Sequence, residues 1–169
     1  VRAGAVGGPV AVHAITGSAG SGARPSLGTH HPERFGDVKA YKILAHQHVP
    51  EIVGFLGGLG AAPAVRFVPV SGPFDRGIFA TCFVPVDEGI DAPALFRRAY
   101  GDAPFVRLRQ GTPRLRWVRG TALCDIAVHR QDETVVVLSA IDNLGRGAAS
   151  QGLQALEAAL GWPSAAPPP

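Results

Sequence analysis

The pattern of apolar and polar positions predicts strands along most of the chain. Residues 9–16 read PVAVHAIT and lie between glycines, and this alternation indicates a strand. Residues 66–71 and 78–86 predict two more strands on either side of a Gly72-Pro73 turn. Further strand-like runs cover residues 105–109, 115–130 (interrupted near Gly120) and 134–141, with a hairpin connection at residues 131–133.

Helical periodicity is found in three segments. One helix is expected to begin near Pro50, since proline is favoured in a first turn, and its apolar face consists of Ile52, Phe55, Leu56 and Leu59. Residues 91–100 predict a short helix with Asp91 as its N-cap, and residues 148–160 predict a final helix. Strands outnumber helices and hairpin connections dominate. We therefore predict an α+β domain, a mostly antiparallel or mixed sheet with helices packed on one face.

The chain has the size and composition of a single globular domain. Of its 169 residues, 46% are hydrophobic and 17% are charged, which argues against a disordered chain. We assign residues 1–162 to the domain and expect the Pro/Ala-rich residues 163–169 to be a disordered tail. The sequence contains no methionine, so we expect its first residue to be internal to a longer gene.

Charge and cysteine content narrow the possible partners. The net charge of +3 is modest, and the arginines between residues 107 and 119 alternate with apolar residues, as on the wet face of a strand. This pattern argues against a nucleic-acid partner. No apolar run approaches the roughly 18 residues of a membrane span. Two cysteines give no disulfide framework, which suits a cytoplasmic location.

The segment HQHVPEI is the sharpest cluster of chemically active side chains. His46 and His48 are two positions apart, so both point the same way if the segment is extended. Glu51 falls in the first helical turn, where its carboxylate can orient an imidazole for acid–base catalysis. Two alternatives stay open. One is an acidic helix N-terminus beside surface histidines, and the other is a metal site with His30 or His31 as a further ligand.

Two other segments can face a ligand. The loop TGSAGSG at residues 16–22 offers backbone amides that can cradle an oxyanion or phosphate. Its glycine spacing fits neither the dinucleotide fingerprint nor the Walker A loop, and a flexible loop is the alternative. Asp142 and Asn143 end a strongly apolar strand, where they can serve a ligand or cap the following helix.

The remaining candidates are an arginine and the two cysteines. Arg76 follows Asp75 in a turn, and it can form a fork for a carboxylate or an ordinary surface pair. Cys82 and Cys124 lie within apolar, strand-like segments. We interpret both as packing residues rather than nucleophiles.

Taken together, four segments resemble the N-acetyl-γ-glutamyl-phosphate reductase family of arginine biosynthesis. They are TGSAGSG, AYKILAHQHVPEI, FVPVSGPFDRGIFAT and AIDNLGRGAASQGLQAL. Their order and spacing are similar to the family's over residues 9–160, with Gln47 where arginine is common. Each segment alone is unremarkable, whereas the four in order are specific.

The resemblance implies a two-domain enzyme that reduces N-acetyl-γ-glutamyl phosphate to its semialdehyde with NADPH. The nucleophilic cysteine and most of the NADP site are expected in a domain upstream of Val1. This chain would be the catalytic and dimerisation domain, folded like the C-terminal domain of glyceraldehyde-3-phosphate and semialdehyde dehydrogenases. Its helix 148–160 would return to the cofactor domain. The implied partners are a small acyl phosphate and further copies in a dimer or tetramer, and the chain alone is expected to be inactive.

The resemblance also implies roles for individual residues. His48 is expected to be the acid–base residue and Glu51 to orient it, because histidine exchanges protons near neutral pH. The residues expected at the substrate are Arg76, His46, Ser18 and Gly20. Arg76 would hold a carboxylate or phosphate through its guanidinium. Asn143 is expected near the nicotinamide, and no metal is expected.

Two other functions compete with this expectation. A related enzyme would reduce a carrier-linked aminoadipyl phosphate in lysine biosynthesis with the same architecture. A non-catalytic dimerisation module would keep the sheet without the chemistry. The joint presence of His48, Glu51 and Arg76 argues against the module.

Overall fold

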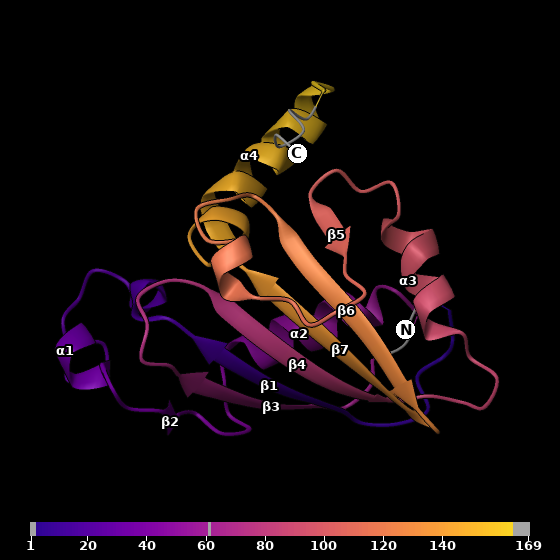
Figure 1. Cartoon of the computed structure of the whole chain (residues 1–169), viewed down its shortest axis with the longest axis horizontal. Coiled ribbons are helices and arrows are strands. Elements are labelled where there is room, and N and C mark those ends of the chain that lie inside the picture. The colour runs from indigo at the N-terminus through magenta and orange to yellow at the C-terminus, as the bar shows by residue number, and fades with distance from the viewer. Residues whose placement is uncertain (1–2, 61, 164–169) are drawn as a thin grey trace.

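The computed structural model describes residues 3–60 and 62–163, and in these a single seven-stranded sheet has the order β2-β3-β1-β4-β7-β6-β5 (Figure 1). The strands are β1 (Val10–Thr16), β2 (Lys39–Ala40), β3 (Val65–Ser71), β4 (Ile78–Pro85), β5 (Val106–Leu108), β6 (Cys124–Gln131) and β7 (Thr134–Ile141). The helices are α1 (His31–Arg34), α2 (His48–Gly57), α3 (Ala92–Tyr100) and α4 (Ser150–Leu160). Three short turns complete the set: the 3₁₀ helices η1 (Ser18–Ser21) and η2 (Leu115–Trp117), and the π-helix η3 (Gly145–Ala149).

The sheet is mostly antiparallel, which confirms the predicted α+β class. Only β1 with β3 and β5 with β6 run parallel, and the other neighbours are antiparallel. The hairpin expected at residues 131–133 joins β6 to β7, and Asp132 adopts a φ of 51° at its tip. Of the predicted tail, all residues but the first lie outside the described part of the chain.

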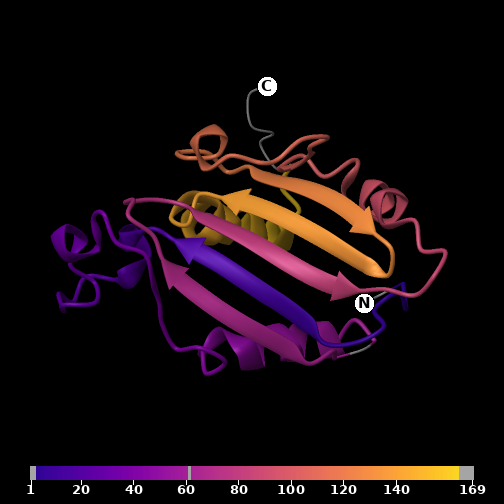
Figure 2. The same ribbon diagram turned by 60° about the horizontal axis from the view of Figure 1, so that its bottom comes forward.

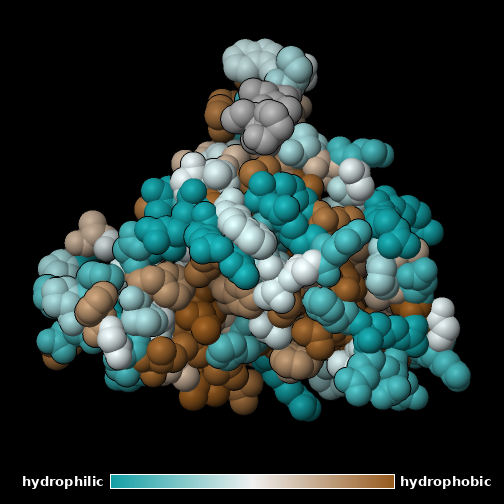
Figure 3. All heavy atoms as spheres, viewed as in Figure 1, coloured by the Kyte–Doolittle hydropathy of each residue, from teal (hydrophilic) through white to brown (hydrophobic). Residues whose placement is uncertain are grey.

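Helices cover one face of the sheet and leave much of the other open (Figure 2). On the covered face, Val135 packs with Ala92 of α3 and with Val86. We call the other side of the sheet the open face, since its side chains point away from Val135. Cross-strand neighbours on this face are Ala11 of β1, Phe83 of β4, Val136 of β7 and His129 of β6. Phe83 is 47% exposed there. In space-filling view, hydrophobic surface alternates with hydrophilic side chains over the molecule (Figure 3).

One end of the sheet is covered by the segment before β6, and here the first part of the predicted strand-like run over residues 115–130 is wrong, whereas the interruption near Gly120 and the strand after it are confirmed. The strand begins only at Cys124, because Leu115–Trp117 forms a 3₁₀ turn and Gly120 adopts a φ of 74°. The apolar residues of this segment turn inward instead of pairing. Val118 is fully buried, and it packs in one cluster with Leu115, Phe79, Leu123 and Ala140.

The helices differ from expectation mainly at their starts. The helix α2 begins at His48, two residues before the expected start, and Pro50 lies in its first turn as predicted. The predicted apolar face of α2 is only partly covered, since Phe55 is 70% exposed. The N-cap of α3 is confirmed, because Oδ1 of Asp91 accepts a hydrogen bond of 2.9 Å from the amide of Ala94. The π-helix η3 precedes α4 and delays its start to Ser150.

The helix α4 extends away from the sheet (Figure 1). Its leucines Leu153, Leu156 and Leu160 are each more than half exposed, although apolar side chains at helical spacing usually face a protein surface. Within the described residues, no helix is long and apolar enough to span a bilayer.

Candidate functional site

Three segments meet where β1 and β7 end and β4 begins. The amide of Gly17, after β1, donates to the carbonyl of Gly77 at 2.9 Å. The amide of Gly77 in turn donates to Oδ1 of Asn143, after β7, at 2.7 Å. We call this group, with Arg76 and Asp142, the strand-end cluster. Since its members lie at the ends of three neighbouring strands, residues from distant parts of the sequence share one site.

Glycine is required at the first contact of this cluster. A Cβ on Gly17 would lie 2.5 Å from the carbonyl oxygen of Asp75, closer than real Cβ atoms come. The following amides are also engaged: that of Ser18 donates to Phe74 at 3.0 Å and that of Ala19 to Asp75 at 2.8 Å. The glycine-rich loop is therefore a folded turn, and these two amides are committed to the protein rather than available to a ligand.

Two residues without a predicted role at this site hold the glycine-rich loop. Arg34 is 7% exposed and donates to Oγ of Ser21 at 3.0 Å and to the carbonyl of Thr16 at 2.8 Å. His31 places Nδ1 at 2.8 Å from Oγ of Ser18. Both come from α1, in a polar stretch without periodicity. The sequence offered His31 only as a possible metal ligand, and no pattern indicated Arg34.

Asn143 lies against the glycine-rich loop, and the oxygen of its side-chain amide is hydrogen-bonded while the nitrogen is not. It is 8% exposed, and its Nδ2 has no hydrogen-bond partner among the described residues. A Cβ on Gly20 would lie 3.1 Å from this nitrogen, so glycine keeps the approach open. A buried amide donor without an acceptor is costly, and it suits an acceptor brought by a ligand.

Arg76 forms an ion pair with Asp142, not with its neighbour Asp75. Its Nε lies 2.7 Å from Oδ2 of Asp142, whereas Asp75 accepts two hydrogen bonds of 2.8 Å from Arg119. The alternative that Arg76 and Asp75 form a surface pair is therefore wrong. Arg76 keeps 35% of its side chain exposed, so a ligand can reach it.

Burial by itself raises the pKa of the Asp142 carboxyl, but its donors outweigh this effect. Backbone amides at Gly145, Gly120 and Leu144 and the guanidinium of Arg76 surround it. Together they hold the pKa of Asp142 below its usual range. The carboxylate is thus ionised at neutral pH.

We expect this carboxyl to make the folded chain sensitive to acid. Because the pKa of Asp142 is lower in the folded than in the unfolded chain, its contribution to stability is complete above about pH 4. It is lost as the pH falls through the folded value. Urea midpoints measured from neutral to acidic pH should decline more steeply for the native sequence than for Asp142→Asn. Equal declines would contradict this expectation.

The histidine segment forms a second group, beside β3. His46 is buried, with its ring 5.2 Å from that of Phe67 and 4.7 Å from that of His48. Burial, followed by the charges of His48 and Lys42, lowers the pKa of His46. Its Nδ1 accepts a hydrogen bond of 3.3 Å from the amide of His48, so we assign the neutral Nε2–H tautomer.

The imidazoles of His46 and His48 lie close together, but not because the segment is extended, as the sequence suggested. His48 is the first residue of α2 and the segment is not extended, so the expected alternation does not apply. His48 and Glu51 are exposed, and no described hydrogen bond or ion pair joins Glu51 to either histidine. Its orienting role therefore stays a prediction. Within residues 3–60 and 62–163 no three His, Cys, Asp or Glu side chains are grouped closely enough to hold a metal.

The structure thus places the predicted residues in two groups. Ser18, Gly20, Arg76 and Asn143 belong to the strand-end cluster and its loop, whereas His46, His48 and Glu51 lie beside β3. No hydrogen bond or ion pair among the described side chains joins the two groups. Burial raises the pKa of both cysteine thiols, at Cys82 and Cys124, which disfavours the reactive thiolate.

Comparison with known proteins gives a family and a fold. Residues 1–143 match the family described as semialdehyde dehydrogenase, dimerisation domain. N-acetyl-gamma-glutamyl-phosphate reductase of Halorhodospira halophila is 41% identical over 161 residues, which are 91% of this chain and 47% of the relative. The enzyme of the same name from Geobacillus thermodenitrificans is 39% identical over 161 residues, 90% of this chain and 47% of the relative. The chain spans about half the length of these curated relatives.

Solved structures support the fold alone. Aspartate semialdehyde dehydrogenase II from Vibrio cholerae superposes with a TM-score of 0.71 at 14% identity, over 92% of this chain and 56% of that one. A probable aspartate-semialdehyde dehydrogenase from Pseudomonas aeruginosa gives a TM-score of 0.74 at 13% identity, over 94% and 57%. The expected fold of semialdehyde-dehydrogenase C-terminal domains is confirmed.

Proposed function

This chain belongs to the semialdehyde dehydrogenase dimerisation-domain family, and from that premise we propose that it is the acid–base and substrate-binding half of an NADP-dependent N-acetyl-γ-glutamyl-phosphate reductase. Relatives at about 40% identity bear that name. In this proposal a companion domain supplies the cysteine nucleophile and most of the NADP site. The chain alone turns over no substrate.

The observation that carries the proposal is the partly exposed side chain of Arg76 at the end of the sheet. Its Nε lies 2.7 Å from Oδ2 of Asp142 in an ion pair, and its terminal nitrogens make no described hydrogen bond, so they are available to another anion. Guanidinium donors match the oxygens of a carboxylate or phosphate in pairs. The proposed substrate carries both groups, and the glycine-rich loop with Ser18 and Gly20 borders the same site.

The residues at this site also fit the amide of a nicotinamide cofactor. Nδ2 of Asn143 is buried and has no described hydrogen-bond partner. It faces Gly20, which has no side chain that would block this nitrogen. An amide donor of this kind would bind the carboxamide oxygen and orient the ring. NADPH supplies the hydride when it is bound.

His48 is proposed to move the protons of the reaction. The cysteine must lose a proton before it attacks the acyl carbon and releases phosphate, and the oxygen of the reduced thioester must gain one. The imidazole of His48 is exposed at the start of α2, and histidine is the side chain that most often transfers protons in general acid–base catalysis. Neutral His46, packed 4.7 Å away, adds no second positive charge, and Glu51 in the same turn would orient His48 when substrate is bound.

The proposal is tested by joining this chain to the amino-terminal half of the Halorhodospira halophila relative, which we call the two-domain enzyme. We expect phosphate-dependent oxidation of N-acetylglutamate semialdehyde, followed by the absorbance of NADPH. Aspartate semialdehyde, the substrate in the names of the solved neighbours, should be used much less efficiently. A folded two-domain enzyme that prefers aspartate semialdehyde, or oxidises neither, would overturn the proposed function.

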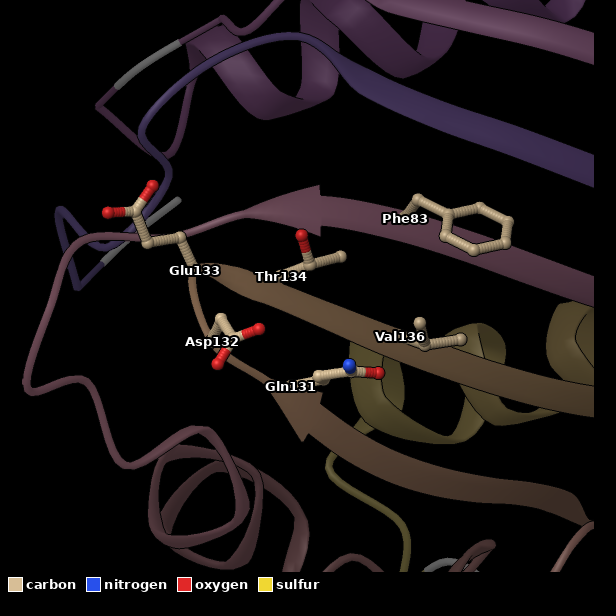
Figure 4. Close-up of a pocket in the computed structure, with 6 residues that line it drawn as sticks. All are labelled: Phe83, Gln131, Asp132, Glu133, Thr134 and Val136. Atoms are coloured by element: carbon tan, nitrogen blue, oxygen red, sulfur yellow. The ribbon is translucent and has the colours of Figure 1, made fainter.

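Self-association through the open face is part of this proposal. At the β6–β7 hairpin the face is hollowed by a shallow pocket of about 570 Å³, lined by Phe83, Gln131, Asp132, Glu133, Thr134 and Val136. Figure 4 shows Phe83 and Val136 standing on the same side of neighbouring strands. We propose that a second copy covers this surface, which agrees with the description of the family as a dimerisation domain.

We expect Phe83→Asp to weaken self-association of the two-domain enzyme. A buried aromatic anchor contributes ~2 kcal/mol or more, so the dissociation constant should rise roughly 30-fold. Sedimentation velocity over a range of concentrations measures this change. Leu27→Asp is the control, since Leu27 is 84% exposed on a loop away from the sheet. If both variants associate alike, the open face is not the interface.

The proposal has two further parts, which concern the assembly and the compartment of the chain. We propose that the leucines of α4, which are uncovered here, pack against the companion cofactor domain. A cytoplasmic location completes the proposal. It is supported by two cysteines that form no disulfide and by the biosynthetic chemistry proposed.

A further inference from the structure

Asp142 joins three segments of the strand-end cluster at one fully buried carboxylate. Its Oδ1 accepts hydrogen bonds from the amides of Leu144 at 2.9 Å and Gly145 at 2.7 Å. Its Oδ2 accepts one of 2.6 Å from the amide of Gly120 and lies 2.7 Å from Nε of Arg76. One side chain therefore links the turn after β7, the segment before β6 and the start of β4.

The ion pair with Asp142 limits the positions that the guanidinium of Arg76 can take. A guanidinium is planar and carries its donors in a fixed fork. Nε of Arg76 lies 2.7 Å from Oδ2 of Asp142 as an ion pair, although it is not aligned as a hydrogen-bond donor. Because the carboxylate is itself anchored by three amides, the attraction between the two charges restricts where the guanidinium can lie. The terminal nitrogens of Arg76 make no described hydrogen bond, and they are available to an external anion on a side chain that is 35% exposed.

The carboxylate of the adjacent residue, Asp75, does not contact the guanidinium of Arg76. Asp75 precedes Arg76 in sequence, but it accepts both of its described hydrogen bonds from Arg119. That pair is exposed, with 44% of Arg119 and 57% of Asp75 accessible. A carboxylate distant in sequence, and not the adjacent one, controls the arginine.

We propose that Asp142 is a positioning residue for the anionic group of the substrate, acting by holding the guanidinium of Arg76 in its binding orientation. This rests on the proposed function, because it requires Arg76 to bind the carboxylate or phosphate of the substrate. Asp142 itself is buried and touches no ligand. Its amide contacts also stabilise the fold, so a test must separate these two effects.

A double-mutant cycle in the two-domain enzyme makes this separation. The variants are Asp142→Asn, Arg76→Ala and the two combined. Asparagine keeps an oxygen for the amides of Leu144 and Gly145, but its NH₂ group then faces other donors where Oδ2 stood. Melting temperatures report the structural loss, and KM values for phosphate and for the semialdehyde report the positioning.

We expect Asp142→Asn to raise one KM about 10- to 100-fold, the effect of misplacing a binding group, with a smaller change in kcat. The KM that rises tells whether Arg76 holds the phosphate or the carboxylate. In the Arg76→Ala background the same substitution should change KM less than about twofold, because residues that act as a unit are not additive. The loss in melting temperature should persist in both backgrounds.

Asp75→Asn is the matched control. It removes a carboxylate from the turn that contains Arg76, but this carboxylate is bonded to Arg119 and not to the guanidinium of Arg76. It should leave both KM values unchanged. Equal effects of Asp142→Asn on KM with and without Arg76 would overturn the positioning role. If Arg76→Ala itself leaves both KM values intact, the assignment of Arg76 in the proposed function fails instead.

Discussion

Replacing His48 with alanine in the two-domain enzyme should lower kcat about 10²- to 10⁴-fold, the range for loss of a general acid–base group. The exposed position of His48 at the start of α2 means that its removal disturbs little packing. The folded state should therefore be retained, and the loss should appear as chemistry. Rates of NADPH formation at saturating semialdehyde and phosphate measure it.

A matched histidine separates this effect from a general change of surface charge. His30 is also exposed, and its side chain makes no described hydrogen bond. His30→Ala should retain full activity. An active His48→Ala enzyme would require another proton carrier and would remove the central catalytic assignment.

The second large effect is expected on stability, at Asp125. This carboxylate is fully buried between two arginines, with Oδ1 2.6 Å from Nε of Arg107 and Oδ2 3.0 Å from Nε of Arg109. Asp125→Ala should lower the free energy of unfolding by about 3 kcal/mol. That value is at the lower end of the range for breaking a buried ion pair, because both guanidiniums keep about a third of their surface in water.

Urea unfolding followed by tryptophan fluorescence is suited to this measurement. Trp117 lies beside the site, with the guanidinium of Arg109 5.3 Å and that of Arg114 5.2 Å from its ring centroid. Asp75→Ala provides the comparison, since it removes an exposed pair and should cost only about 0–1 kcal/mol. Equal losses in the two variants would show that burial of Asp125 contributes nothing.

The strands could be predicted where side chains alternate between a covered and an open face. β1 follows that alternation, whereas β3 and β7 are more continuously apolar, and the bounds of all three agree with the predictions to within a residue or two. Residues 115–123 alternate equally well, but Leu115 and Val118 pack onto the end of the sheet instead of pairing. Local periodicity shows which side chains are buried, but it does not show which part of the protein covers them.

The candidate site was only partly predictable for a similar reason. Arg76 and Asn143 could be singled out because they lie at the ends of strand segments. The role of Asp142 could not, because its donors come from positions as distant as Arg76 and Gly120. Arg34 was missed altogether, since it is buried by a loop whose fold depends on the contact of Gly17 with the turn before β4.

The lengths of the outermost strands have a consequence for how this molecule avoids polymerising. β2 has two residues and β5 has three, and they flank the sheet on its two sides. A short edge strand presents few unpaired amides and carbonyls, so a neighbouring chain gains little by adding its own strand there. Lateral growth into fibrils is thereby disfavoured, even though the long central strands pair readily with one another.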